Sequence, residues 1–208
     1  MTMKVIWVRH AETEWNHRGI IQGHRDSFVT HRGMQETAAL LTALTKEAYP
    51  IECVYSSPLG RALHMGLKLS EGLDCPLQVE ESLKEQSFGC FEGISFDHFR
   101  RDHPRDADAL LALDAAYCPP EGESLAQATR RVINFLQHLQ NTNEHQIVCV
   151  VSHGHVSQGV LALLKEGTLD NFSRYAHPNA SYSVFDFTDG KCAALRWGIA
   201  THLIQLQR

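Results

Sequence analysis

Three short apolar runs in the chain have the composition of strands that are buried on both faces. They are rich in valine, isoleucine and aromatic residues, show little polar alternation, and cover residues 4–8, 52–56 and 147–151. Continuous runs of this kind are typical of a parallel sheet that is covered by helices. The sequence therefore predicts an α/β fold with a mostly parallel central sheet.

Two segments that follow the first two strands have apolar residues at helical spacing. The first predicted helix covers residues 31–48, with Thr30 as its N-cap. The second begins with Ser57 as N-cap and Pro58 at the first helical position. The residues expected on the buried faces are Met34, Ala38, Leu41 and Leu44 in the first helix and Leu59, Ala62, Leu63 and Leu67 in the second.

The second half of the chain continues the alternation of helices and strands. Ser124 and Gln127 form a capping box that starts the clearest amphipathic helix. A shorter helix over residues 156–164 ends near Gly167. Asp189-Gly190 is a hairpin signal between two final strands. The expected apolar face of the capped helix consists of Leu125, Ala128, Val132, Phe135, Leu136 and Leu139, and the two strands cover residues 182–187 and 193–199.

One segment departs from this pattern. Residues 94–118 are charged and irregularly amphipathic, and Pro119-Pro120 then imposes an extended break. We interpret the segment as a small helical insertion that folds over the strand ends as a lid. A chain of 208 residues is long enough for one α/β domain with a full core, so residues 1–208 are predicted to form a single domain.

Composition narrows the class of protein. The net charge of -5 argues against broad nucleic-acid binding, which needs a large basic surface. No stretch has the apolar length of a membrane span, and residues 1–4 lead into a strand without a secretory apolar region. The six cysteines contain no CxxC pair, so no disulfide framework or zinc knuckle is indicated. We expect a cytoplasmic protein without a membrane or nucleic-acid partner.

Polar residues follow each of the three buried strands. Arg9 and His10 follow the first, Arg61 lies in the first helical turn after the second, and His153 follows the third. Right-handed crossovers place the carboxyl ends of these strands at one edge of the sheet, where ligands bind in such folds. A single histidine is more often an ordinary hydrogen-bonded residue. The joint occurrence at three strand ends favours an anion pocket.

The motifs that carry these residues resemble the histidine phosphatase (phosphoglycerate mutase-like) superfamily, branch 1, and arrive in the order typical of that family. The resemblance implies a three-layer α/β/α sandwich and a phosphatase that needs no metal or cofactor. The matching stretches are Arg9-His10-Ala11-Glu12, Trp15-Asn16, Gln22-Gly23, Ser56-Ser57-Pro58-Leu59-Gly60-Arg61-Ala62, Leu83-Lys84-Glu85, Phe88-Gly89-Cys90-Phe91-Glu92-Gly93, Pro120-Glu121-Gly122-Glu123-Ser124 and Ser152-His153-Gly154.

The same resemblance implies a role for each site residue. His10 would be the nucleophile that becomes phosphorylated, and Glu85 the proton donor. Arg9, Arg61 and His153 would hold the phosphoryl oxygens. Asn16 and Gln22 match positions that bind phosphate or the leaving group, and Gly23 and Gly154 belong to the same binding motifs.

General chemistry supports these roles. Arginine offers a planar set of charged N–H donors for the oxygens of a transferred phosphoryl group. A neutral imidazole is a nucleophile at pH 7 when one ring nitrogen is held as a donor, usually by a backbone carbonyl, and the other faces phosphorus. A single carboxyl such as Glu85 can protonate the leaving oxygen and then deprotonate the attacking water. This scheme requires no metal.

Three other functions are alternatives to a phosphatase. A phosphoglycerate mutase of the same family is one alternative, although the chain is shorter than typical mutases. The His153-Gly154-His155 sequence suggests a metal site, but residues one apart on a strand point to opposite faces. A non-enzymatic protein that binds a phosphorylated ligand would be expected to lack His10 or Glu85, and both are present.

The substrate is the least determined feature. Sugar phosphates, nucleotides, phosphoserine and a cobalamin-precursor phosphate all remain open, as does the choice between monomer and homodimer. Ala11 stands where the family usually has glycine. We predict that specificity resides in the insertion, where Arg100, Arg101 and Arg105 would meet a second anionic group on the substrate. The alternative is a solvated surface helix.

Overall fold

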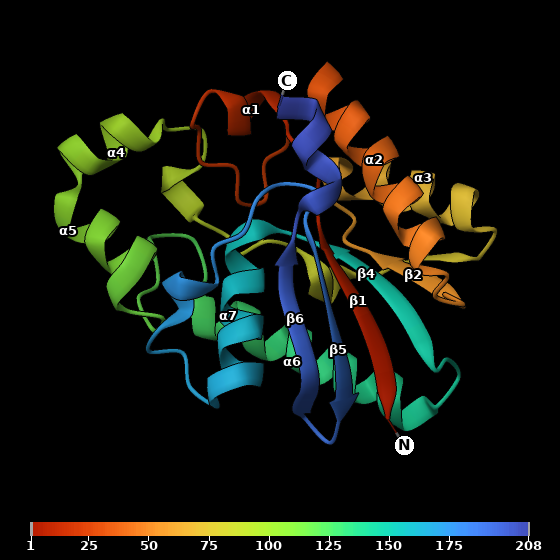
Figure 1. Ribbon diagram of the computed structural model, residues 1–208. Coiled ribbons are helices and arrows are strands. Elements are labelled where there is room, and N and C mark those ends of the chain that lie inside the picture. The colour runs from red at the N-terminus through yellow and green to blue at the C-terminus, as the bar shows by residue number, and fades with distance from the viewer. Residues whose placement is uncertain (1, 208) are drawn as a thin grey trace.

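A six-stranded sheet forms the centre of the computed structural model, which describes residues 2–207 (Figure 1). The strand order is β3-β2-β4-β1-β5-β6, and β5 alone runs against its neighbours. The strands are β1 (Met3–Arg9), β2 (Cys53–Ser56), β3 (Leu77–Val79), β4 (Ile147–Ser152), β5 (Tyr182–Thr188) and β6 (Lys191–Ile199). The mostly parallel sheet predicted from the apolar runs is confirmed.

Helices cover both faces of the sheet. One face packs against α2 (His31–Glu47), α3 (Gly60–Leu73) and the C-terminal turn η5 (Thr201–Gln207). The other packs against α6 (Leu125–Thr142) and α7 (Gly154–Glu166). These three layers confirm the expected α/β/α sandwich.

Strand β1 shows why the apolar runs lack polar alternation. Its alternate residues Val5 and Trp7 belong to the core beneath α6 and α7, whereas Ile6 and Val8 belong to the core beneath α2 and α3. Successive side chains of a strand point to opposite faces, so a strand covered on both sides must be apolar at every position.

The two N-terminal helices differ from prediction in start or register. Helix α3 begins at Gly60 with Leu59 as its N-cap, not at Pro58, and the Ser57 hydroxyl contacts both the Leu59 N–H and the His153 ring. The expected faces of α2 and α3 are rotated as well. Leu44 is buried, but Met34 is 48% and Leu67 54% exposed. The buried faces contain Gly33, Glu36, Thr37, Leu40 and Leu44 in α2 and Arg61, Ala62, Met65, Gly66 and Leu69 in α3.

The predicted buried faces were rotated because polar and small residues occupy inner positions of these helices. In α3, buried Arg61 takes one place on the inner face, and Gly66 takes another because an added Cβ would lie 2.8 Å from Ser56. A count of apolar residues overlooks both. By contrast, all six apolar residues predicted for α6 are buried, and its capping box of Ser124 and Gln127 is present.

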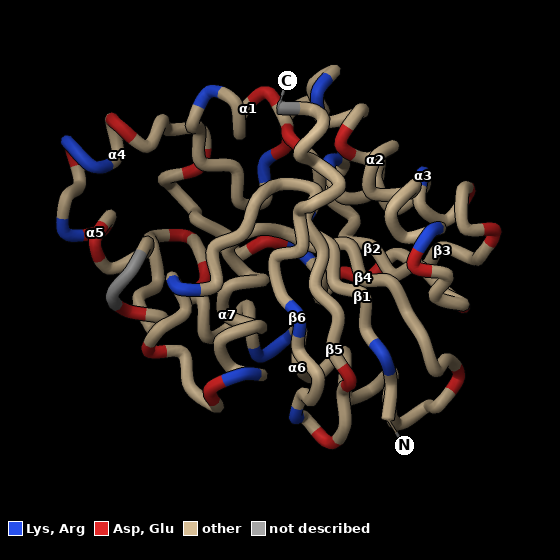
Figure 2. The backbone as a smooth tube through the Cα atoms, viewed as in Figure 1, with Lys and Arg blue, Asp and Glu red and all other residues tan. Residues whose placement is uncertain are grey.

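The insertion forms a separate apolar cluster beyond the carboxyl ends of the strands. It consists of α4 (Phe96–Asp102), α5 (Pro104–Asp108) and the π-helical turn η3 (Ala109–Leu113). Its charged residues lie on the outside, and basic and acidic positions are interleaved along α4 and α5 (Figure 2). The cluster itself contains Ile21, Phe88, Phe91, Phe99, Ala107 and Leu110.

Several short elements complete the fold and were not predicted. Besides β3, they are α1 (Glu14–His17), η1 (Glu81–Leu83), η2 (Gly89–Phe91) and η4 (Phe172–Tyr175). Elements of three or four residues carry too little periodicity to be recognised. No helix among residues 2–207 combines the length and the apolarity needed to cross a bilayer.

Candidate active site

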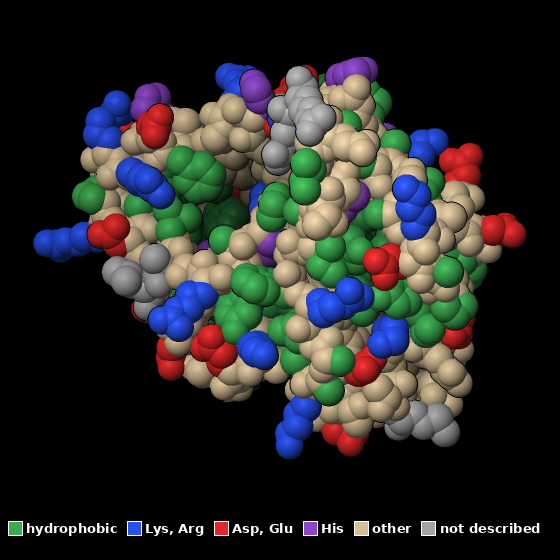
Figure 3. All heavy atoms as spheres, in the orientation of Figure 1, with side chains coloured by type: hydrophobic (Ala, Val, Ile, Leu, Met, Phe, Trp, Pro, Cys, Tyr) green, Lys and Arg blue, Asp and Glu red, His purple; other side chains and the backbone are tan. Residues whose placement is uncertain are grey.

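The predicted site residues meet at one edge of the sheet because β2, β4 and β1 are parallel neighbours. A cavity of about 190 Å³ lies there, between the strand ends and the insertion. Figure 3 shows a hollow on this side of the molecule, with hydrophobic side chains on its wall. Its lining includes eight predicted site residues, which are Arg9, His10, Asn16, Gln22, Gly23, Arg61, Glu85 and Gly154.

His10 is buried at the end of β1, and its ring is held by the backbone. Its Nδ1 lies 2.8 Å from the carbonyl oxygen of Ala11, so Nδ1 carries the proton and Nε2 presents a lone pair. The pKa of His10 lies well below its ordinary value because of burial, and the positive charges of Arg61 and Arg9 lower it further. The imidazole is therefore neutral at pH 7.

His153 lies beside His10 and does not itself line the cavity. The centroids of the two rings are 5.2 Å apart, and burial together with the charge of Arg61 also holds the pKa of His153 well below its ordinary value. Its Nε2 is 2.7 Å from the hydroxyl oxygen of Ser57. Its Nδ1 is buried and has no hydrogen-bond partner among the described residues.

Arg9 brings a partly buried positive charge to the cavity. Its Nη1 donates to the carbonyl of His177, and its buried Nε has no partner in the described part of the chain. Burial lowers the pKa of this guanidinium. Gly154 makes room for it, because a Cβ at that position would lie 2.9 Å from Arg9 Cζ.

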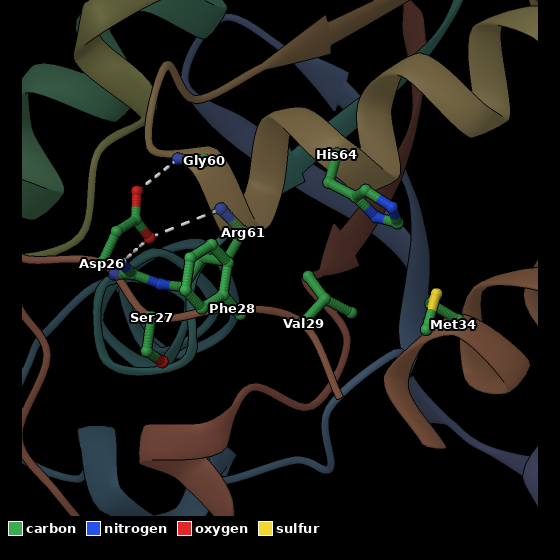
Figure 4. Close-up of a pocket in the computed structure, with 8 residues that line it drawn as sticks. All are labelled: Asp26, Ser27, Phe28, Val29, Met34, Gly60, Arg61 and His64. Carbon is green, nitrogen blue, oxygen red and sulfur yellow. Dashed lines mark hydrogen bonds and ion pairs between the residues drawn. The ribbon is translucent and has the colours of Figure 1, made fainter. Parts of the chain in front are cut away.

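Arg61 is held from the opposite side by the loop that follows α1. Its Nη1 donates to Asp26 Oδ1 and to the Arg25 carbonyl, each at 2.8 Å, and Nη2 donates to the Gly23 carbonyl at 2.7 Å. The Asp26 carboxylate also accepts the backbone N–H of Gly60 (Figure 4). Asp26 thus caps α3 and orients the guanidinium at the same time.

Asn16 and Gln22 present their amide groups in the same way. The Asn16 carbonyl accepts from Thr13 N at 3.2 Å and from Asn179 Nδ2 at 3.2 Å. The Gln22 carbonyl lies 3.1 Å from the hydroxyls of both Thr13 and Ser27. Because both carbonyl oxygens are engaged, the NH₂ groups are the ends available as donors to a ligand in the cavity.

The Glu85 carboxylate lies at the N-terminus of α7. Oε1 accepts the backbone N–H groups of Gln86 at 2.9 Å and Val156 at 2.7 Å, and Oε2 accepts that of His155 at 2.9 Å. Since a carboxylate oxygen has two lone pairs, Oε2 keeps one that can take a proton. Arg131 fixes the loop by donating 2.8 Å bonds to the carbonyls of Lys84 and Glu85.

The insertion borders the cavity, but not with the basic residues that we expected. Phe96, Leu110 and Leu111 line it, whereas Arg100 faces a different hollow and Arg101 pairs with its neighbour Asp102 in solvent. None of Arg100, Arg101 and Arg105 is among the residues that line the cavity, so its geometry does not support the prediction that they meet a second anionic group. The reason is the apolar cluster of the insertion, which turns its hydrophobic side inward and its charges outward.

Several supporting residues were missed by the sequence analysis. Asp26 and Arg131 hold Arg61 and the Glu85 loop, and His155 lines the cavity at the position after Gly154. Arg131 could have been suspected from its place on the polar side of the capped helix, eight residues after Glu123, with which it forms a 2.7 Å ion pair. Asp26 had no comparable signal, because a loop aspartate is common.

The His153-Gly154-His155 sequence is explained by the start of a helix and not by a strand. His153 is the N-cap of α7, and His155 is its second residue. Within residues 2–207, no group of three or more histidine, cysteine or acidic side chains is placed to hold a metal ion.

A larger cavity lies on the outer side of Arg61. It has a volume of about 510 Å³ and is open to solvent between the Asp26 loop, α2 and α3 (Figure 4). Phe28, Val29 and Met34 make most of its surface apolar. The smaller cavity is the candidate active site, since it contains the histidines, arginines and carboxylate that could perform a reaction.

Replacement of Gly154 by alanine should weaken the binding of inorganic phosphate about 10-fold or more. The added methyl group displaces the Arg9 guanidinium, and a hydrogen bond to a charged group contributes about 1.5–3 kcal/mol. Gly159→Ala is the matched control on the same helix, where the Cβ meets Thr129 at 2.1 Å. Isothermal titration should show weaker binding in Gly154→Ala alone, although both variants lose stability. Equal affinities would contradict this account of Gly154.

The protonation of His10 gives a second prediction. An ordinary histidine is half protonated near pH 6.5, but burial and two nearby guanidinium groups favour the neutral ring. In the unliganded protein His10 should therefore remain mostly neutral at pH 6.5 and carry its proton on Nδ1. Nitrogen NMR of the imidazole, with a histidine peptide as reference, measures both properties. Half protonation at pH 6.5 or above would contradict the prediction.

Comparison with known proteins agrees with this geometry. Phosphoserine phosphatase 1 of Hydrogenobacter thermophilus is 30% identical over 97% of this chain and 94% of its own length. The adenosylcobalamin/alpha-ribazole phosphatase of Salmonella typhimurium is 34% identical over 78% of this chain and 77% of its own. The solved structure of Bacillus stearothermophilus YhfR superimposes with a TM-score of 0.88 at 28% identity, and the match covers 97% and 99% of the two chains.

The match to a family model is equally extensive. The model of the histidine phosphatase superfamily (branch 1) covers residues 5–200, which include every predicted site residue. The family inferred from the motifs is therefore confirmed, and this chain belongs to branch 1 of the histidine phosphatase superfamily.

Proposed function

We propose that this protein hydrolyses a small phosphate monoester in two steps through a phosphohistidine at His10. The observation that carries the proposal is the neutral His10 ring, which the Ala11 carbonyl holds and which lines one cavity with Arg9 and Arg61. In the first step Nε2 attacks phosphorus and the bond to the leaving oxygen breaks. In the second step water attacks phosphorus and releases inorganic phosphate and the free histidine.

The donors around the cavity bind the phosphoryl oxygens in this mechanism. Arg9 and Arg61 supply charged N–H groups, and the amides of Asn16 and Gln22 supply neutral ones. His153 lies outside the cavity lining, beside His10, and supplies Nδ1–H because the Ser57 hydroxyl donates to its Nε2. Gly23 and Gly154 act through their neighbours, the first by accepting from Arg61 and the second by leaving space for Arg9.

Glu85 moves the proton. Its Oε2 has a lone pair left for a proton, which passes to the leaving oxygen in the first step. The same oxygen takes a proton from water in the second step. The bonds from the start of α7 fix the position of the carboxyl group, so both transfers occur at one place.

The relatives support a phosphatase in preference to a mutase. Both named relatives are phosphatases of small metabolites, which agrees with the prediction from the motifs. A single domain, a monomer or homodimer, a cytoplasmic location and the absence of membrane and nucleic-acid partners stay predictions from the sequence.

The proposal is tested by turnover of 4-nitrophenyl phosphate and by trapping of the intermediate. Hydrolysis should continue in EDTA, and rapid quenching with labelled substrate should reveal an acid-labile phosphohistidine. His10→Ala should abolish both, whereas His17→Ala, at an exposed position on α1, should preserve both. Loss of turnover in EDTA that one added metal restores would overturn the metal-independent mechanism. Efficient conversion of 3-phosphoglycerate to 2-phosphoglycerate with little free phosphate would indicate a mutase.

Replacement of Glu85 by glutamine should slow hydrolysis in proportion to the need of the leaving group for a proton. General acid catalysis contributes about 10²–10⁴-fold, so an alkyl phosphate should lose about that factor, and 4-nitrophenyl phosphate far less. The substitution alters the contact between residue 85 and the His155 N–H equally for both substrates. A difference between the two losses therefore cannot come from structural damage. Equal losses for the two substrates would show that Glu85 is not the acid.

A further inference from the structure

The outer part of the active-site cavity has an apolar wall that the phosphate chemistry does not use. Ile20, Phe88, Phe96, Leu110 and Leu111 form it. Phe96 remains 36% exposed, so a bound ligand would remove further apolar surface from water. The polar residues of the same cavity are the proposed donors for the phosphoryl oxygens, so these apolar side chains are left to contact the leaving group of the substrate.

Positive charge is confined to the phosphate side. Among the described residues that line the cavity, Arg9 and Arg61 are the lysine or arginine residues, and both belong to the phosphate site. The remaining acidic or basic group apart from the histidines is the carboxyl group of Glu85, which supplies no positive charge. A carboxylate on the leaving group would therefore lose its hydration against apolar side chains without gaining a cation, which costs free energy.

Two polar side chains that the phosphate site does not use also line the cavity, Gln158 and His155. Gln86 donates through Nε2 to the Glu123 carbonyl at 2.8 Å, which fixes the orientation of its amide. Its Oε1 therefore faces His155 Nδ1 at 2.7 Å as an acceptor, so His155 carries its proton on Nδ1. His155 Nε2 is left as a buried lone pair without a donor among the described residues.

No donor among residues 2–207 forms a hydrogen bond with this nitrogen. The nearby backbone carbonyl of Leu110 is an acceptor too, so it cannot donate to a neutral ring. Burial lowers the pKa of His155, which keeps the ring neutral. The ring is also fixed in place between Phe88 and Phe172, with centroids 5.5 Å away on each side.

We infer that the substrate is the phosphate ester of an uncharged, largely apolar alcohol that carries a hydroxyl or N–H donor for His155 Nε2. The inference rests on the proposed phosphatase function and adds the class of leaving group. The cavity of about 190 Å³ is below the roughly 300–1,000 Å³ of drug-sized sites, so the part of the alcohol inside it is about one ring.

Three benzyl phosphates test the inference, because they share one leaving alkoxide and differ in a ring substituent. Benzyl phosphate is the reference, 3-hydroxybenzyl phosphate adds a donor, and 3-carboxybenzyl phosphate adds an anion. For the hydroxybenzyl ester, kcat/KM should exceed the reference about 3- to 10-fold, the value of one hydrogen bond. For the carboxybenzyl ester it should be about 10-fold or more below the reference.

The variant His155→Phe tests the acceptor itself. Phenylalanine preserves the ring contacts with Phe88 and Phe172 and removes Nε2, so the ratio of hydroxybenzyl to benzyl turnover should fall to about 1. His98→Phe makes the same substitution at an exposed position of α4 that does not line the cavity, and should keep the wild-type ratio.

The outcomes separate this inference from the proposed function. Hydrolysis of all three esters with the carboxybenzyl ester equal to or faster than the others overturns the inference and leaves the phosphatase intact. A hydroxyl preference that persists in His155→Phe overturns the role of His155. Failure of every ester together with absence of phosphohistidine overturns the proposed function instead. The comparison among substrates in the wild-type protein does not depend on the folding of any variant.

Discussion

The active site depends on one partly buried positive charge that has no ion-pair partner among the described residues. Arg9 follows the last apolar position of β1, and among the described residues no carboxylate lies within ion-pair distance of its guanidinium. Its neighbour Arg61 is compensated by Asp26 at 2.8 Å. Burial lowers the pKa of Arg9, which means that the charged form is costly in the absence of an anion. A phosphoryl group supplies the missing negative charge, so the same burial that destabilises the empty site favours an anion in the cavity.

The state of the two imidazoles follows from that charge. His10 and His153 are buried and lie near two guanidinium groups each, and both effects oppose a further positive charge. The His10 ring is consequently a nucleophile instead of another cation. Its direction is set by a carbonyl one residue away, so the attacking nitrogen is determined by the local path of the chain after β1.

The same contact explains why alanine at position 11 is tolerated. Its methyl group packs in the core beneath α2 and α3, and its carbonyl remains on the histidine.

The sequence predicted the parts of the molecule that repeat a simple physical rule. Three apolar strands, the capped face of α6 and the polar groups at parallel strand ends each follow from periodicity or topology. The faces of α2 and α3 did not follow, because buried Arg61 and close-packed Gly66 take inner positions that a hydrophobic pattern assigns to leucine. The position of Asp26 was equally hidden, since its partner lies 35 residues away. The cavity-lining residues of the insertion could not be predicted from its charge for a related reason. Its many charged residues lie on the exposed side, whereas a few apolar residues between them line the cavity.

Catalysis and specificity thus rest on different packing units. The residues that bind the phosphoryl group in the proposed mechanism lie at the strand ends. The two cores on the faces of the sheet hold these strands in place. Two residues of the wall for the leaving group, Phe88 and Leu110, belong to the third cluster, which contains the apolar side of the insertion. A substitution in that cluster changes the shape of the wall without moving Arg9, His10 or Arg61. His155 joins the two units, because its backbone N–H holds Glu85 while its ring faces the wall. For this reason the chemistry of such a chain can be inferred from motifs, whereas its substrate can be inferred only after the side chains of the insertion have been placed.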